Sequence, residues 1–113
     1  MVITFSNKKL EKQANDPRKG LKDLGKLRFD KLTLRLDQLG AAKSLEDLRY
    51  AAGRYHELTT TRKGQWACDL DQPYRLVFVP HEDPIPLDAA GNYDWTAIQG
   101  VEIVEITNYH KEN

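Results

Sequence analysis

Residues 54–80 read RYHELTTTRKGQWACDLDQPYRLVFVP, and the pattern of this stretch decides the fold. Apolar and polar residues alternate with a period of two in a short run from Tyr55 and in two further runs over 65–70 and 74–79. Alternation of this kind is typical of strands that bury one face, so it predicts three strands close together in the sequence.

Two turns separate these strands. Residues 60–64 are polar and basic, and Asp71-Gln72-Pro73 is a typical turn sequence that makes the second and third strands a hairpin. An antiparallel sheet that helices cover on one side shows its other face to water. On that face we expect four side chains to meet: His56, Arg62, Lys63 and Arg75.

Length and composition predict one domain over residues 1–113, because 113 residues with 40% hydrophobic content suffice for one modest core. The single cysteine, Cys68, has no thiol partner, so we expect a buried apolar side chain in a reducing compartment. Lys8 and Lys9 interrupt the N-terminal apolar run, and no stretch approaches the roughly 20 apolar residues of a membrane span. We therefore expect a cytoplasmic protein with no membrane partner.

The net charge of zero hides an asymmetry along the chain. Residues 1–75 carry 16 of the 17 Lys and Arg residues against 10 Asp and Glu, whereas residues 76–113 carry one against seven. A polyanion would therefore bind the first part, and a basic partner the last.

The N-terminal third predicts a strand over 2–5, a first helix that Ser6 caps and that runs to about Ala14, and a second helix. Asp16 as cap and Pro17 at the first helical position begin this second helix, which we expect to run to about Gly40. At helical spacing, six apolar residues fall on one side of this helix, and we expect that side to face the core. They are Leu21, Leu24, Phe29, Leu32, Leu36 and Leu39. Leu27 and Leu34 form a second, narrow stripe, which either the first helix or a partner covers.

The remaining chain predicts one helical turn from Ser44, an irregular excursion over 81–100, and a last strand over 101–109. Trp95 and Ile98 are expected to attach the excursion to the body of the protein. In the last strand Val101 and Ile103 alternate regularly, and Val104 and Ile106 are out of phase with them. We expect this strand in the interior of the sheet, with Asn108, Tyr109 and His110 at its end.

These residues, in this order, resemble the RelE/ParE toxin superfamily of bacterial toxin-antitoxin modules, and most closely its HigB-like branch. The resemblance covers nearly the whole chain and depends on three motifs in register: H-x-L-K-G-x-R-x-G-x-W, Y/W-R-L-x-F and I-x-D-Y-H. The matching residues are His56, Leu58, Arg62, Gly64 and Trp66, then Tyr74, Arg75, Leu76 and Phe78, then Ile106, Tyr109 and His110.

The resemblance implies an α+β fold in which an N-terminal strand and two helices pack on a twisted, mainly antiparallel sheet of four to five strands. It also implies a toxin that cleaves mRNA on the ribosome, inhibits translation and growth, and is neutralised by a helix-turn-helix antitoxin of the HigA type. No cofactor is implied, and the sequence holds no cluster of carboxylate, Cys and His residues near these motifs that would predict a metal site.

Cleavage of RNA without a metal needs two proton transfers and stabilisation of an anionic transition state, and imidazoles and a guanidinium suit these tasks. We assign the two proton transfers to His56 and His110, and charge stabilisation to Arg75. Tyr109 orients the phosphate or stacks on a base. Three further residues are assigned to RNA or phosphate binding: Arg62, Lys63 and Asn108. Each also has an ordinary structural interpretation, such as a strand-end histidine bonded to backbone or an arginine paired with Asp69 or Asp71.

Three departures from the family pattern concern activity. Thr59 stands where many relatives have Lys, Thr60 where they have Gly, and Asn108 where they often have Asp. An amide cannot balance an imidazolium as a carboxylate does, so reduced activity is one expectation, with Arg62 or Lys63 replacing the lost charge. Two alternatives stay open: a ParE-like inhibitor of DNA gyrase on the same fold, and an attenuated member that mainly binds its antitoxin.

Overall fold

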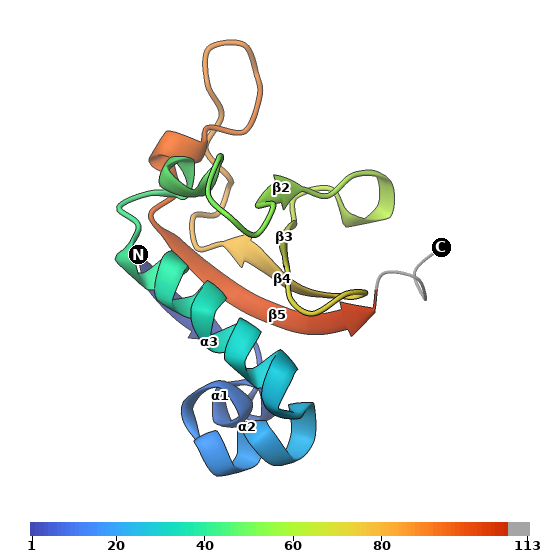
Figure 1. Cartoon of the computed structure of the whole chain (residues 1–113). Helices are drawn as coiled ribbons and strands as arrows, with labels where there is room; N and C mark the ends of the chain where they lie inside the picture. Colours follow the sequence, from blue (N-terminus) through green and yellow to red (C-terminus); the bar gives the residue numbers. More distant parts are fainter. Residues whose placement is uncertain (109–113) are drawn as a thin grey trace.

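The structure is a computed structural model that describes residues 1–108, and it is an α+β fold (Figure 1). Its strands are β1 (Val2–Phe5), β2 (His56–Glu57), β3 (Trp66–Asp69), β4 (Tyr74–Pro80) and β5 (Gly100–Asn108). Its helices are α1 (Lys8–Asn15), α2 (Pro17–Leu24) and α3 (Lys26–Ala41), with 3₁₀ turns η1 (Leu45–Leu48), η2 (Thr60–Arg62) and η3 (Trp95–Ala97). The β3–β4 hairpin is confirmed, and so is the expected order of elements, except that three helices and not two follow β1.

The five strands form one sheet in the order β1-β5-β4-β3-β2, in which β1 runs parallel to β5 and the other neighbours are antiparallel. The expectation that the last strand lies in the interior is therefore confirmed. A β-bulge lies where Val77 pairs with Glu105 and Phe78 with Ile103, which leaves Val104 as the extra residue of β5. This bulge explains why the apolar residues of β5 change phase after Ile103.

The predicted long helix over residues 17–40 is wrong in one respect, because it is two helices that meet at Gly25. Gly25 has φ 79° and ψ 163°, a conformation that favours glycine and ends α2 before α3 begins. The predicted start is confirmed, since the Asp16 carboxylate accepts hydrogen bonds from the Arg18 and Lys19 amides. The first helix is capped by Asn7, not by Ser6: the Asn7 side chain accepts from the Leu10 amide at 2.9 Å.

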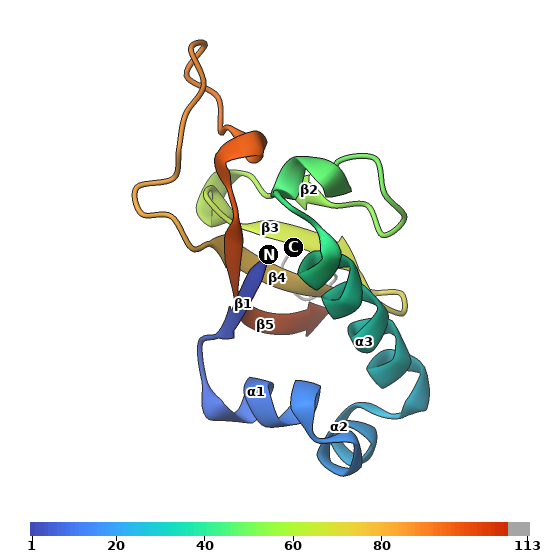
Figure 2. The same cartoon turned by 90° about the vertical axis from the view of Figure 1, so that its left-hand side faces the viewer.

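The main core lies between α3 and one face of the sheet (Figures 1 and 2). Its members include Leu32, Leu39, Leu45, Tyr55, Trp66, Cys68, Leu76, Phe78, Trp95, Ile98, Val101 and Ile103. The predicted stripe of the second helix holds for Leu32 and Leu39, which are buried, and for Leu24 and Leu36, which pack on the core and are partly buried. It does not hold for Phe29, whose ring lies against Gly20 of α2, or for Leu21, which is 44% exposed. The burial predicted for Cys68, Trp95 and Ile98 is confirmed.

The second stripe, Leu27 and Leu34, is not covered by α1. Their side chains are 64% and 47% exposed, because α1 packs mainly against α2 and leaves this side of α3 to solvent. Within residues 1–108, no helix has the length and apolar character needed to cross a membrane.

Candidate functional site

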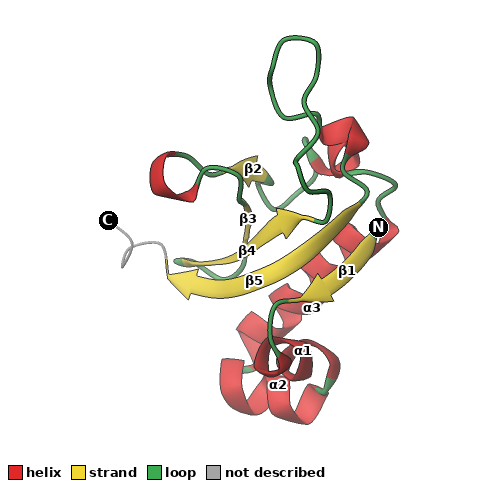
Figure 3. Cartoon of the chain, turned by 180° about the vertical axis from the view of Figure 1, so that it is seen from behind, coloured by secondary structure: helices red, strands yellow, loops and turns green. Residues whose placement is uncertain are grey.

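The two faces of the sheet differ in what covers them. One face packs on α3, and in Figure 3, seen from behind, the strands lie in front of that helix. We call the other side the open face. Strand pairing places two rows of residues on it: His56, Ala67, Val77 and Glu105 in one row, and Asp69, Arg75 and Thr107 in the next. Ala67, Val77 and Leu58 form a small buried apolar patch beneath these polar side chains.

His56 begins the edge strand β2, and its ring is held by the backbone. Its Nδ1 lies 2.6 Å from the carbonyl oxygen of Arg54. Because a carbonyl oxygen only accepts hydrogen bonds, Nδ1 carries the proton, and Nε2 of the neutral ring is left to accept one. A structural histidine at a strand end makes the same bond, so the contact fixes the tautomer but not the role.

Arg75 lies on the same face as His56, two strands away. It pairs with Asp69 on β3 and with Thr107 on β5, and it is half-buried. With strands about 4.8 Å apart and residues about 3.3 Å apart along a strand, the Cα atoms of His56 and Arg75 are separated by roughly 12 Å. Two long side chains on one face at this separation can approach one phosphate group from opposite sides.

Two of the carboxylates near Arg75 hold other arginines. Asp69 accepts two hydrogen bonds from Arg54, at 2.7 and 3.0 Å, and Asp71 accepts two from Arg28, at 3.0 and 3.1 Å. The Arg28 guanidinium also lies over the ring of Tyr74, 3.4 Å from its centre. These pairs join the β3–β4 hairpin to the preceding loop and to α3.

Arg62 reaches across the open face from the turn η2. Its guanidinium donates to the Glu105 carboxylate on β5 and, at 2.8 Å, to the Gln65 side chain. The charge of Arg62 is therefore balanced by an acid within the protein. The sequence did not identify Glu105 as a site residue. It lies two residues from Thr107 in β5, and residues two apart in a strand share a face, so the pattern could have placed it on the open face.

Lys63 lies apart from the other predicted residues. It lines a groove with Glu57, which follows His56 in the chain and points to the opposite face of β2, and with Tyr93. Of the four side chains expected to meet, the structure thus brings His56, Arg62 and Arg75 to the open face and directs Lys63 to a neighbouring groove.

The end of β5 is described only as far as Asn108. Asn108 pairs with Tyr74, so its side chain starts from the helix-covered face and not from the face of Arg75. Tyr109 and His110 lie outside the described residues, and their assigned roles stay predictions.

Thr60 has an unusual backbone. Its φ is 54°, a left-handed conformation in which the Cβ of a β-branched residue crowds its own carbonyl. Glycine takes this conformation without strain.

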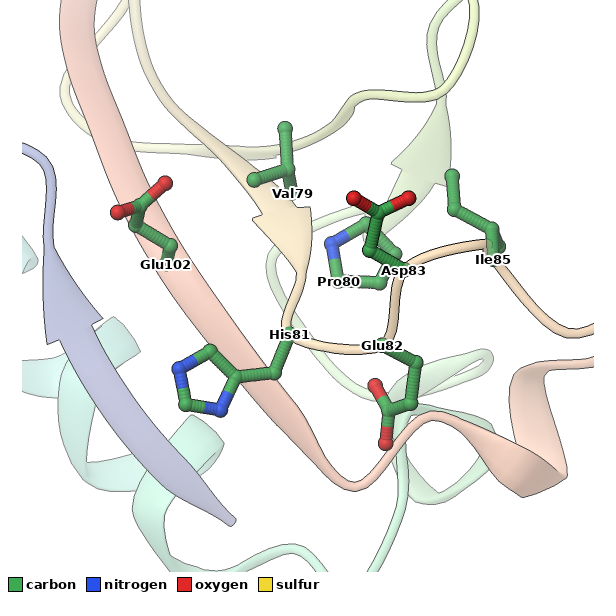
Figure 4. Close-up of a pocket in the computed structure, with 7 residues that line it drawn as sticks. All are labelled: Val79, Pro80, His81, Glu82, Asp83, Ile85 and Glu102. Atoms are coloured by element: carbon green, nitrogen blue, oxygen red, sulfur yellow. The ribbon is translucent and has the colours of Figure 1, made fainter.

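The remaining histidine, His81, is part of a different pocket (Figure 4). That pocket measures about 420 Å³ and includes Asp83 and Glu102. The His81 ring turns toward β1, where its Nε2 lies 3.3 Å from the Thr4 hydroxyl, while Glu82 turns the other way and accepts from the Gln99 amide. His81, which received no role from the sequence, belongs to the end of β4 and not to the open face.

The reactive groups in the core are not available for chemistry at neutral pH. Burial raises the pKa of the Cys68 thiol to about 12, and burial likewise raises the pKa of Tyr55. Across residues 1–108, no three His, Cys, Asp or Glu side chains are grouped as metal ligands.

No protein-family model matches this chain, and no curated protein matches it. Fold and site together define an α+β domain with an open, mixed sheet whose uncovered face carries an imidazole, two arginines and their acidic neighbours.

Proposed function

We propose that this protein is the toxin of a type II toxin-antitoxin module, a RelE/HigB-like endoribonuclease that cleaves mRNA on the ribosome. The observation that supports this best is the placement of His56 and Arg75 on one uncovered face of the sheet. Both residues belong to the motifs that carry the family resemblance. The order of strands and helices agrees with the coarse fold that the resemblance implies.

The chemistry is an attack of the ribose 2′ oxygen on the adjacent phosphorus. The new bond joins the 2′ oxygen to phosphorus, the bond from phosphorus to the 5′ oxygen breaks, and the products are a 2′,3′-cyclic phosphate and a 5′ hydroxyl. Nε2 of neutral His56 takes the 2′ proton, and the protonated imidazole of His110 gives a proton to the 5′ oxygen. The forked donors of Arg75 stabilise the extra negative charge on phosphorus.

Three alanine variants test this assignment: His56→Ala, Arg75→Ala and His110→Ala. Loss of a proton-transfer group or of a charge donor is expected to reduce cleavage of ribosome-bound mRNA by a factor on the order of 10² or more. His81→Ala is the matched control, because this third histidine lies in a different pocket. Retained antitoxin binding shows that the variants are folded, and full activity in all three would refute the nuclease assignment and direct the search to a gyrase-type target.

A second candidate is an attenuated member that mainly binds its antitoxin. It is favoured by the pairing of Arg62 with Glu105, by the position of Asn108 opposite Tyr74, and by the exposed Leu27 and Leu34 side chains. The substitutions Asn108→Asp and Thr59→Lys restore residues that relatives use. They are expected to raise activity in an attenuated nuclease and to change nothing in a protein that only binds.

A further inference from the structure

A groove of about 590 Å³ lies beside the edge strand β2, on the opposite side of that strand from His56. Its volume is within the range of roughly 300–1,000 Å³ that is common for ligand sites. One wall is the turn that contains Lys63, and the other is the hairpin of residues 87–93, which projects beyond the sheet in Figure 2.

The hairpin that forms this wall is held in one conformation by its own hydrogen bonds. The Asp88 carboxylate accepts from the amides of Ala90 and Asn92, at 2.9 and 3.0 Å, and the Asp88 amide donates to the Asn92 carbonyl at 2.8 Å. Gly91 completes the turn with a φ of 83°. Asn92 and Tyr93 are therefore presented to the groove in a fixed arrangement.

Two residues that line the groove, Tyr93 and Glu57, are held by buried tryptophan rings beneath it. Tyr93 packs against Trp66 with ring centres 5.3 Å apart, and Trp66 packs edge-on against Trp95. The Trp95 indole donates to Oε2 of Glu57 at 2.8 Å, which orients the carboxylate and leaves Oε1 for a ligand.

The charged side chains that line the groove differ in whether they bind other groups of the protein. Arg49 lies over the Trp95 ring and donates to Glu46, and the Asp88 carboxylate is used by its own turn. Lys63 is exposed, and no carboxylate of residues 1–108 forms an ion pair with it. The groove thus offers an ammonium group for a phosphate, a fixed acceptor and an amide for a base edge, and a tyrosine for stacking. Single-stranded RNA is recognised by this combination of groups.

We propose that this groove is a subsite for one nucleotide of the RNA strand, next to the one that is cleaved. Lys63 binds its phosphate, Tyr93 stacks on its base, and Glu57 with Asn92 reads the base edge. Guanine is the preferred base, because one of its two adjacent N–H donors can bond to Oε1 of Glu57 and the other to the side-chain oxygen of Asn92. Arg62 and Lys63 are neighbours in one turn, so a strand that crosses the turn passes from the open face into the groove. This subsite rests on the proposed ribonuclease function.

An NMR titration tests the subsite with the whole protein and a short single-stranded RNA whose riboses are 2′-O-methylated and cannot be cleaved. The backbone amides of Lys63 and residues 87–93 are expected to shift together with those around His56 and Arg75. Lys63→Gln is expected to weaken binding about tenfold and to lower the salt dependence by about one ion. Lys43→Gln, which changes an exposed lysine just before η1, is expected to leave binding unchanged. Glu57→Gln is expected to remove a preference for oligo-G over oligo-U RNA.

The outcomes separate this subsite from the function on which it rests. Chemical-shift changes around His56 and Arg75 with none in the groove would refute the subsite but agree with the proposed ribonuclease function. Shifts in the groove alone would support a nucleotide site there and count against cleavage on the open face. No shift anywhere at millimolar RNA would overturn both, and an unchanged base preference in Glu57→Gln would overturn the role of Glu57.

Discussion

The Arg62 guanidinium donates a hydrogen bond to the Glu105 carboxylate, and this pair joins the turn η2 to β5 across the open face of the sheet. On this face, the row His56, Ala67, Val77 and Glu105 runs across the sheet from β2 to β5, and Arg62 contacts its last residue. The pair therefore covers part of the surface on which His56 and Arg75 lie, and it neutralises the charge of Arg62, a residue that we propose binds RNA.

Glu105→Gln is expected to strengthen RNA binding, because the substitution leaves the full positive charge of Arg62 available to phosphate. The slope of log affinity against log salt concentration should steepen by about one ion. Fluorescence anisotropy with a short RNA at several salt concentrations measures both the affinity and this slope. Glu102→Gln is the matched control, since it removes a charge from the same strand at the pocket of His81. Equal effects of the two substitutions would show that net charge, not release of Arg62, is responsible.

Thr60→Gly is expected to stabilise the protein. The left-handed conformation costs an L-residue roughly 1–2 kcal/mol, and the extra freedom of glycine in the unfolded chain offsets roughly 0.5–1 kcal/mol of this. Unfolding in urea should therefore give a gain of up to about 1.5 kcal/mol. Thr59→Gly, at φ −124°, has no strain to relieve and should lower stability instead. A loss of stability in both variants would contradict strain at Thr60.

The pair Leu34→Ala and Leu39→Ala tests the packing of α3. Leu39 is fully buried, so its truncation should lower the free energy of unfolding by about 2–5 kcal/mol, whereas truncation of exposed Leu34 should change it by less than about 0.5 kcal/mol. Antitoxin binding measured on the same two proteins is the second readout. A large loss of stability in Leu34→Ala would show that a neighbouring element covers this residue in solution.

Because the Cys68 thiol is buried, we expect the free energy of unfolding to fall at alkaline pH. The pKa of this thiol is raised by burial from 9.0 to about 12, so above pH 9 the unfolded state loses a proton that the folded state keeps. Stability is then fully present below pH 9 and falls at higher pH by up to about 1.4 kcal/mol per pH unit. Tyr55, whose pKa is also raised by burial, adds to the fall above about pH 10. Cys68→Ala should remove the part of the slope that begins near pH 9, and an unchanged slope in urea unfolding at pH 8 to 10 would refute this.

Local patterns predicted most of the fold. Period-two alternation and turn residues located the strands, and Asp16 with Pro17 located the start of α2. The break at Gly25 was missed because one glycine within a helical pattern is often tolerated, and its left-handed φ cannot be read from periodicity. The exposure of Leu27 and Leu34 was not decided either, since it depends on how α1 packs, which is a tertiary contact.

The candidate site was predicted less completely. Strand alternation correctly placed His56 and Arg75 on one face. The separation of Lys63 from Arg62 depends on the path of a 3₁₀ turn, and the pairing of Arg62 with Glu105 joins residues 43 apart in the sequence. Local patterns do not contain such contacts.

The chemistry at the cut ends of the RNA tests the central proposal most directly. Ribosome-bound mRNA is treated with the protein, and mass spectrometry determines the ends of the two fragments. Attack by the 2′ oxygen predicts a 2′,3′-cyclic phosphate, or its hydrolysed 3′-phosphate form, on the upstream fragment and a 5′ hydroxyl on the downstream fragment, with no product from an mRNA that carries a 2′-deoxyribose at the cut site. A 3′ hydroxyl with a 5′ phosphate, or cleavage at the deoxyribose, would contradict the acid-base mechanism assigned to His56, Arg75 and His110.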